Sequence, residues 1–254
     1  MGPEIDISSE LLERHIPALR AIAQLGVKYG PGRWVIVGGM MVMILGREYR
    51  ARSPRAEGTK DADILVDIVS RPDLLADVVN FLIESMAYEP QDPVGDPDHA
   101  ARCTLVSGPA QIDVLCPDDT PEPNLFVPER NVASIAIPGG RRALETARPV
   151  SLFYSDEHLN AEAYLPTLAG AIVTKVASAL DARTAGSPRH LEDVGFLLTM
   201  SADPDEVRRQ FTDADLVLLG RIDGYVADTR SPMWQQLDGR QRQLGQAMYQ
   251  ALLA

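Results

Sequence analysis

Hydrophobic and polar positions in the first 155 residues alternate between helical spacing and short runs typical of strands. Apolar residues recur at helical spacing in three segments, which predicts helices over residues 8–29, 40–49 and 71–86. Between and after these helices, short runs rich in β-branched residues predict strands, so a sheet flanked by helices is expected. The predicted strands are residues 33–37, 62–68, 101–107, 111–116, 132–137 and 149–154.

The pattern changes at about residue 156, after which strand alternation disappears and the segments have helical spacing. The predicted helices are residues 156–184, 188–200, 204–210, 213–228 and 232–253. We therefore expect an α+β protein with two domains. Residues 1–155 would form a mixed β-sheet domain with flanking helices, and residues 156–254 a helical domain that closes a cleft against it.

The net charge and the lack of a long apolar segment argue against broadly nucleic-acid-binding, membrane-spanning and secreted classes of protein. The formal net charge is −12 and the pI about 4.8, which argues against a broad nucleic-acid-binding surface, because such surfaces need clustered Lys and Arg. The longest apolar run, Trp34–Leu45, is shorter than the roughly 20 residues that span a membrane, and the N-terminal residues lack the apolar core of a secretory signal. Cys103 and Cys116 both fall in strand-like runs and are expected as buried thiols in a reducing compartment. The sequence therefore predicts a cytoplasmic protein with no membrane partner.

Two carboxylates precede an apolar run in the stretch GTKDADILVD, residues 58–67. In a strand, residues i and i+2 point to the same side, so Asp61 and Asp63 are expected to project together while Ala62 faces the core. Two like charges this close repel one another, and a divalent cation compensates them, since Mg²⁺ prefers carboxylate and phosphate oxygens. The alternative is a pair of solvated carboxylates at the end of a strand.

A third carboxylate, Asp113, lies inside the apolar run IDVLC, where a charge is costly unless it is paired or coordinated. If Ile112 and Val114 face the core, Asp113 faces the other side and can join Asp61 and Asp63. It would then ligate a second ion or take a proton from an attacking hydroxyl. These three aspartates are the predicted ligands of Mg²⁺, and an exposed position of Asp113 on an edge strand is the alternative.

A Gly-Gly pair, Gly38 and Gly39, joins the predicted strand at 33–37 to the helix at 40–49. Glycine lets the backbone approach a phosphate closely, and the N–H groups at the start of the helix point toward it. The stretch VIVGGMM matches neither GxGxxG nor a P-loop with its lysine, which disfavours dinucleotide-binding and Walker-type sites. Both glycines are therefore candidates for contact with a phosphate, although Gly-Gly is also common in tight turns.

Arginines are concentrated in the stretch GREYRARSPR, which contains Arg47, Arg50, Arg52 and Arg55. They lie between the Gly-Gly pair and the Asp pair, with Lys60 just after them, so we expect them at the rim of the cleft. In a chain with net charge −12, such a cluster predicts contact with phosphates of a nucleotide or of an RNA acceptor. The alternative is a loop whose arginines pair with Glu48 and Glu57.

The order of these features resembles the nucleotidyltransferase fold, in particular its AbiEii-type branch, which includes the MenT toxins. The pattern of that branch, GG…(S/T)xDhD, is matched by Gly38, Gly39, Thr59, Asp61 and Asp63. The branch also has a lysine near a helix start, then an arginine, and a following helix that carries an aspartate. The stretches KVASALDAR and RHLEDVGFLL supply the matching residues Lys175, Arg183, Arg189 and Asp193. His190 stands where the family usually has Asp, and the resemblance covers roughly residues 30–200.

The resemblance implies a Mg²⁺-dependent enzyme that moves an NMP from an NTP to an acceptor hydroxyl. Gly38, Gly39 and Thr59 would bind the nucleotide, and Lys175 would reach its phosphates. Asp193 would line the cleft or position Lys175, whose apolar helix requires a carboxylate or phosphate partner unless its ammonium extends to solvent. The family also implies the toxin of a toxin–antitoxin pair, with tRNA as acceptor and a cognate antitoxin as partner.

Three other functions remain open from the residues alone. An aminoglycoside-type nucleotidyltransferase would have an acidic pocket for a polycation, which the net charge of −12 suits and the arginine cluster does not. A protein AMPylator has no discriminating feature in this sequence. A nucleotide-binding module without turnover would bind NTP with Mg²⁺ and release no pyrophosphate, and the joint presence of Asp61, Asp63 and Asp113 counts against it.

Overall fold

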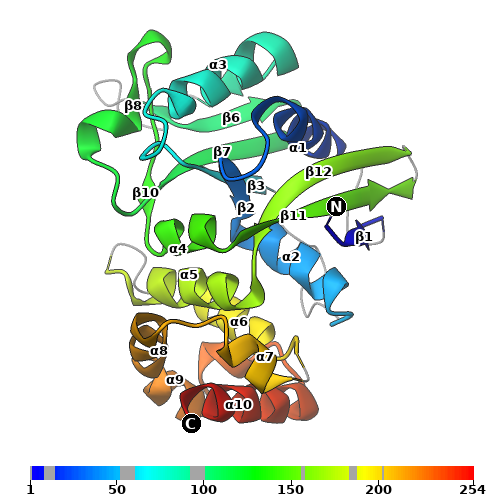
Figure 1. Cartoon of the computed structure of the whole chain (residues 1–254), viewed down its shortest axis with the longest axis vertical. Coiled ribbons are helices and arrows are strands. Elements are labelled where there is room, and N and C mark those ends of the chain that lie inside the picture. Colours follow the sequence, from blue (N-terminus) through cyan, green and yellow to red (C-terminus); the bar gives the residue numbers. More distant parts are fainter. Residues whose placement is uncertain are drawn as a thin grey trace.

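The computed structural model describes residues 2–8, 15–51, 61–91, 101–155, 158–182, 188–201 and 203–254. Strands and helices are mixed along the chain up to Pro166, and the α-helices that follow lie together in Figure 1. The strands are β1 Glu4–Asp6, β2 Trp34–Val37, β3 Asp61–Val66, β4 Glu89–Pro90, β5 Ala101–Arg102, β6 Thr104–Ser107, β7 Ala110–Pro117, β8 Phe126–Val127, β9 Val132–Ala133, β10 Ala136–Ile137, β11 Ala147–Tyr154 and β12 Leu159–Pro166. The α-helices are α1 Ile16–Tyr29, α2 Gly38–Glu48, α3 Leu74–Met86, α4 Gly140–Glu145, α5 Leu168–Leu180, α6 Arg189–Leu197, α7 Pro204–Arg208, α8 Asp213–Gly220, α9 Asp223–Ala227 and α10 Gly239–Leu253.

The largest sheet has the strand order β2-β3-β7-β6-β4, with β10 also paired to β7. β3 and β7 run parallel, whereas the pairs β2–β3, β6–β7 and β4–β6 are antiparallel, so the sheet is mixed. Ile64 of β3 and Val114 of β7 lie in register and are fully buried. Because side chains alternate along a strand, their polar neighbours in sequence lie on the other face. The predicted strands at 33–37, 62–68 and 111–116 are confirmed, and all three belong to this sheet.

A second sheet, β1-β11-β12, contains the main departure from the sequence prediction. The prediction of helix over 156–184 is wrong in its first part, because Leu159–Pro166 is strand β12, paired antiparallel with β11. Alanine, glutamate and leucine in the stretch LNAEAYLP favour helix locally, but pairing with β11 buries Ala161 and Ala163 in the core. The boundary predicted between residues 155 and 156 falls inside this hairpin, and the division into two domains stays a prediction.

Smaller departures occur near the N-terminus and at the short helix α4. Residues 4–6, for which no strand is predicted, form β1 parallel to β11. The first helix is described from Ile16, and residues 9–14 of the predicted helix lie outside the described ranges. The short helix α4, Gly140–Glu145, is not among the helices predicted from the sequence, and Asp118 accepts hydrogen bonds from the backbone N–H groups of Gly139 and Arg141 at its start.

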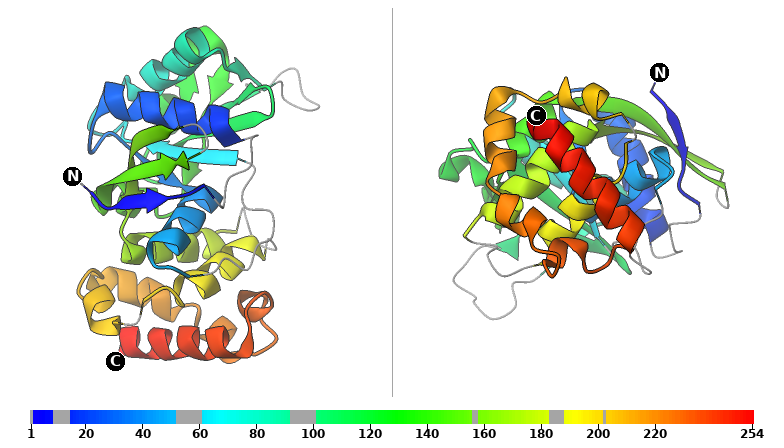
Figure 2. Two further views of the ribbon diagram at one scale, coloured as in Figure 1. Left: turned by 90° about the vertical axis from the view of Figure 1, so that its right-hand side faces the viewer. Right: turned by 90° about the horizontal axis from the view of Figure 1, so that it is seen from below.

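Helices α5 to α10 form the lower part of the molecule in Figure 1, and α10 lies furthest from the sheets (Figure 2). α5 packs against α4 and β12, and α6 packs against α5 and α2, so these two helices connect the helical region to the sheets. Within the ranges described, no helix is long and apolar enough to cross a membrane. The architecture confirms the predicted α+β class, with mixed sheets and flanking helices followed by a helical C-terminal region.

Candidate active site

The three aspartates predicted as metal ligands lie close together at the start of one strand and the middle of its neighbour. β3 and β7 are parallel, and their register pairs Asp63 with Asp113 and Asp61 with Gln111. Register partners point to the same side of a sheet, so these four side chains share one face, which we call the carboxylate face. The residues between them on both strands are buried on the opposite face. The structure therefore brings Asp61, Asp63 and Asp113 together across two strands that are distant in sequence.

Gly38 packs directly against the carboxyl group of Asp63. Val37 is in register with Asp63, so the first residue of α2 follows immediately beside that side chain. A Cβ atom on Gly38 would lie 1.7 Å from Oδ2 of Asp63, and Gly38 has a φ of +66°, which favours glycine. Gly39 follows in the first turn of α2. Gly38, which is predicted to contact a phosphate, therefore also brings the N-terminal end of α2 close to the Asp63 carboxylate. Negative charge is favoured at that end of a helix.

The electrostatic setting of Asp63 is that of a carboxylate among other carboxylates. Burial of its carboxyl group, and after it the neighbouring Asp113, raise the pKa of Asp63 to about 6. Asp61 acts in the same direction, while the cations of Lys175 and Arg189 act to lower this pKa. Asp63 is therefore a buried carboxylate beside like charges, and the cations of Lys175 and Arg189 do not offset the effect of burial on its pKa.

Lys175 of α5 and Asp193 of α6 form an ion pair with 2.8 Å between Nζ and Oδ2. Only 5% of Lys175 and 2% of Asp193 is exposed, so the ammonium does not extend to solvent. Such a buried pair is costly to break, because removing one partner takes away a charge that compensates the other in the interior. Since Lys175 also acts on the pKa of Asp63, the helical region supplies a fixed cation to the carboxylate face.

Gln111 is a residue of the carboxylate face that the sequence did not single out. Its Nε2 donates to Oδ1 and to Oδ2 of Asp113, at 3.3 Å in each case. Glutamine belongs to no motif in this chain, and the only signal in the sequence is its position two residues before Asp113 in a predicted strand. The strand period places every second residue on the same face, so that spacing could have identified it.

The donor set on the carboxylate face suits a magnesium–nucleotide complex. Among the residues that the structure describes, no group of three or more His, Cys, Asp or Glu side chains is arranged so that it could hold a metal ion, so the three aspartates are not confirmed as a joint set of ligands. Mg²⁺ is commonly held by one or two carboxylates that are completed by substrate phosphates and water, and not by a cage of protein ligands. Neighbouring carboxylates that repel one another, with a raised pKa at Asp63, fit a cation of this kind. Asp63, with Asp61 or Asp113 beside it, would hold such an ion.

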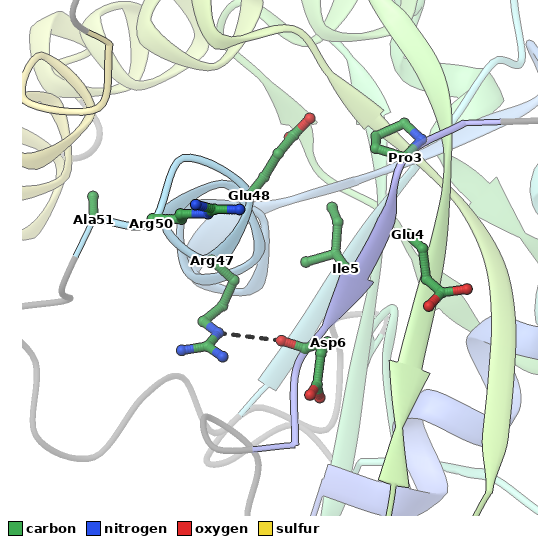
Figure 3. Close-up of a pocket in the computed structure, with 9 residues that line it drawn as sticks. Pro3, Glu4, Ile5, Asp6, Arg47, Glu48, Arg50 and Ala51 are labelled. Carbon is green, nitrogen blue, oxygen red and sulfur yellow. Dashed lines mark hydrogen bonds between the residues drawn. The ribbon is translucent and has the colours of Figure 1, made fainter.

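Arg47 and Arg50, predicted at the rim of the cleft, lie at the other end of α2 from Gly38. Arg47 is about 14 Å along the helix axis from that glycine, at the usual rise per residue. With residues of β1 they line a cavity of about 560 Å³ (Figure 3). There Nε of Arg47 donates to the backbone oxygen of Asp6 at 3.2 Å. These two arginines therefore line a cavity to which the three aspartates do not contribute.

Two of the remaining predicted residues lie at the start of α6, and the others lie outside the described ranges. Arg189 is the first residue of α6 and acts on Asp63, so it lies toward the carboxylate face, and His190 follows it. For residues outside the described ranges the predicted roles stay predictions. These residues are Thr59, Arg52, Arg55, Lys60 and Arg183.

Comparison with known proteins identifies no family for this chain, because no family model and no curated protein matches it. Among solved structures, a STING-associated CdnE c-di-GMP synthase from Capnocytophaga granulosa aligns over 94% of this chain and 78% of its own, with 10% identity and a TM-score of 0.28. A likeness at that TM-score carries no argument about fold or function, so only the residues and their geometry bear on what the chain does.

Proposed function

We propose that the chain is a Mg²⁺-dependent nucleotidyltransferase, which moves an NMP from an NTP to an acceptor hydroxyl and releases pyrophosphate. The observation that carries the proposal is the register pairing of Asp63 with Asp113, with Asp61 on the same face and Gly38 packed on Asp63. Support also comes from the sequence pattern GG…TxDhD and from the buried Lys175 beside it.

In this reaction a bond forms between the acceptor oxygen and the α-phosphorus, and the bond from that phosphorus to the pyrophosphate oxygen breaks. A bound Mg²⁺ would neutralise phosphate charge and hold the triphosphate in line for attack. Asp63 and Asp61, with one oxygen of Asp113, would hold the metal–nucleotide complex, and the other oxygen of Asp113 takes the proton from the acceptor hydroxyl. Positioning and neutralisation of charge are the main catalytic effects expected in such a transfer.

The phosphates of the nucleotide have two further contacts in this proposal. Lys175 approaches them from α5, and Asp193 keeps the ammonium in place through their ion pair. The backbone N–H groups of Gly38 and Gly39 at the start of α2 face the phosphates from the other side. The pyrophosphate that leaves carries the remaining charge, which Lys175 partly neutralises.

For the acceptor we propose tRNA, with the chain as the toxin of a toxin–antitoxin pair. The family resemblance of the motifs suggests this, and the net charge of −12 restricts how RNA can bind. A largely acidic molecule repels the body of an RNA, so contact is confined to the site and to the arginine-rich segment. A single-stranded 3′ end meets that restriction, because it is thin enough to enter while the folded body stays outside.

An aminoglycoside-type acceptor is the second candidate. The carboxylate face and the overall negative charge would attract a polycation, and this acceptor needs no basic surface.

The test is transfer from each α-³²P-labelled NTP, with Mg²⁺ and total tRNA, by the full chain. Asp63→Asn is the inactive variant, and Asp205→Asn, which changes an exposed carboxylate on α7, is the matched control. Label on tRNA with the wild type and with Asp205→Asn, and none with Asp63→Asn, supports the proposal. Pyrophosphate release only when an aminoglycoside is added selects the second acceptor. Binding of NTP with no transfer to tRNA, aminoglycoside or protein would contradict an enzymatic function.

A further inference from the structure

Gln111 is the uncharged member of the four residues that define the carboxylate face. It is in register with Asp61 on β3 and precedes Asp113 by two residues on β7, so its side chain lies beside both. Its amide nitrogen is 3.3 Å from each carboxylate oxygen of Asp113. A donor shared between both oxygens restricts rotation of the carboxyl group, which one hydrogen bond would leave freer.

We propose that Gln111 is a positioning residue, which holds the Asp113 carboxylate turned toward Asp63 and thereby sets the affinity of the site for a divalent cation. The inference rests on the proposed function, since it assigns Gln111 a role at the same metal site. Without the amide, the Asp113 carboxylate turns away from Asp63, because separation relieves the repulsion between the two charges. With the amide in place, both carboxylates face a common point before the metal arrives.

The contact with Gln111 does not itself exclude a metal from Asp113. A carboxylate oxygen has two lone pairs, so the hydrogen bond from Gln111 uses only one of them on each oxygen. An uncharged donor also relieves repulsion without competing for the site, whereas a lysine at this position would place a cation where the metal binds. Partners that orient a metal-binding carboxylate in this way typically change metal affinity by roughly 10–100-fold when they are removed.

The experiment measures binding of Mn²⁺ alone to the full chain, by the EPR signal of the free ion, so that it does not depend on catalysis. The variants are Gln111→Met and Gln111→Leu, each with and without Asp113→Asn, and the matched control is Gln24→Met at an exposed position of α1. Thermal unfolding in EDTA identifies which of the two Gln111 variants is folded, and that one is used. We expect the dissociation constant for Mn²⁺ to rise at least roughly tenfold in the Gln111 variant and to stay unchanged in the control. In the Asp113→Asn background the same change should have no further effect.

Equal affinity of the wild type and the Gln111 variant would overturn the inference while leaving the metal site intact. A loss that persists undiminished in the Asp113→Asn background would also overturn it, because Gln111 would then act on the metal directly. Absence of Mn²⁺ binding by the wild type would remove both the inference and the proposed function. A weakened affinity in a chain that transfers no nucleotide would keep the positioning role and contradict only the proposed reaction.

Discussion

Replacing Asp63 by Asn should make the metal-free protein more stable, and increasingly so as the pH rises. The pKa of Asp63 is about 6 in the folded chain, against an ordinary value of 3.8. At a pH between these two pKa values, Asp63 of the folded chain keeps a proton that the unfolded chain has released. The free energy of unfolding therefore falls as the pH rises through this range. Each pKa unit corresponds to about 1.4 kcal/mol, so the loss at pH 8 amounts to about 3 kcal/mol. Asn has nearly the same shape and no charge, and it removes this loss.

The assay is urea unfolding in EDTA, followed by circular dichroism at two pH values. Asp63→Asn should exceed the wild type by about 3 kcal/mol at pH 8 and by less than about 1 kcal/mol at pH 4, where Asp63 is largely protonated. The control Asp205→Asn should show no comparable dependence on pH. A variant that is less stable than the wild type at pH 8, or a difference that is the same at both pH values, would refute the assignment of Asp63 as a carboxylate held among like charges.

Three other predictions concern the surroundings of this carboxylate. Gly38→Ala should lower stability by roughly 1–3 kcal/mol and abolish Mn²⁺ binding, because the added Cβ overlaps the Asp63 carboxylate and φ at this position is positive. Urea unfolding measures the loss of stability and EPR measures Mn²⁺ binding. Retained binding would contradict the prediction. Lys175→Met should destabilise by roughly 3–5 kcal/mol by removing the cation that pairs with buried Asp193. Lys175→Met/Asp193→Leu should recover most of the stability but no nucleotidyl transfer, and recovered transfer would show that Lys175 has only a structural role. Cys103 and Cys116 are buried thiols with raised pKa values, Cys116 at about 11, so a thiol reagent at pH 8 should label them only after unfolding, and rapid labelling of the native chain would contradict their burial.

Local pattern was sufficient for strands β2, β3 and β7 of the largest sheet, but not for β4 of that sheet or for β12 of the hairpin beside it. The runs around Val35, Ile64 and Val114 are rich in β-branched residues, so their local preference and their final environment agree. Strand β12 consists largely of residues that favour helix, and its conformation comes from pairing with β11 along eight register positions, Ala147↔Pro166 to Tyr154↔Leu159. A contact of that kind depends on tertiary packing, which periodicity in one segment does not report.

The candidate site shows the same division between local and tertiary information. The spacing of Asp61 and Asp63 predicts that they share a face, but only the register of β3 with β7 places Asp113 opposite Asp63. The partner of Lys175 likewise depends on how α5 packs on α6. From the sequence, its apolar helix predicted either a charged partner or extension of the ammonium to solvent, and burial excludes the second. Gln111 was not predicted as a site residue, because an uncharged side chain in a strand gives no sign of a buried or compensated charge.

The most direct test of the proposed nucleotide site is a crystal structure of the chain with Mg²⁺ and a non-hydrolysable NTP analogue. We expect an ion bound by an oxygen of Asp63 and by phosphate oxygens at about 2.0–2.1 Å, with Lys175 at the triphosphate and Gly38 beside it. A nucleotide bound elsewhere, for example in the cavity lined by Arg47 and Arg50, with no ion at Asp63, would contradict it.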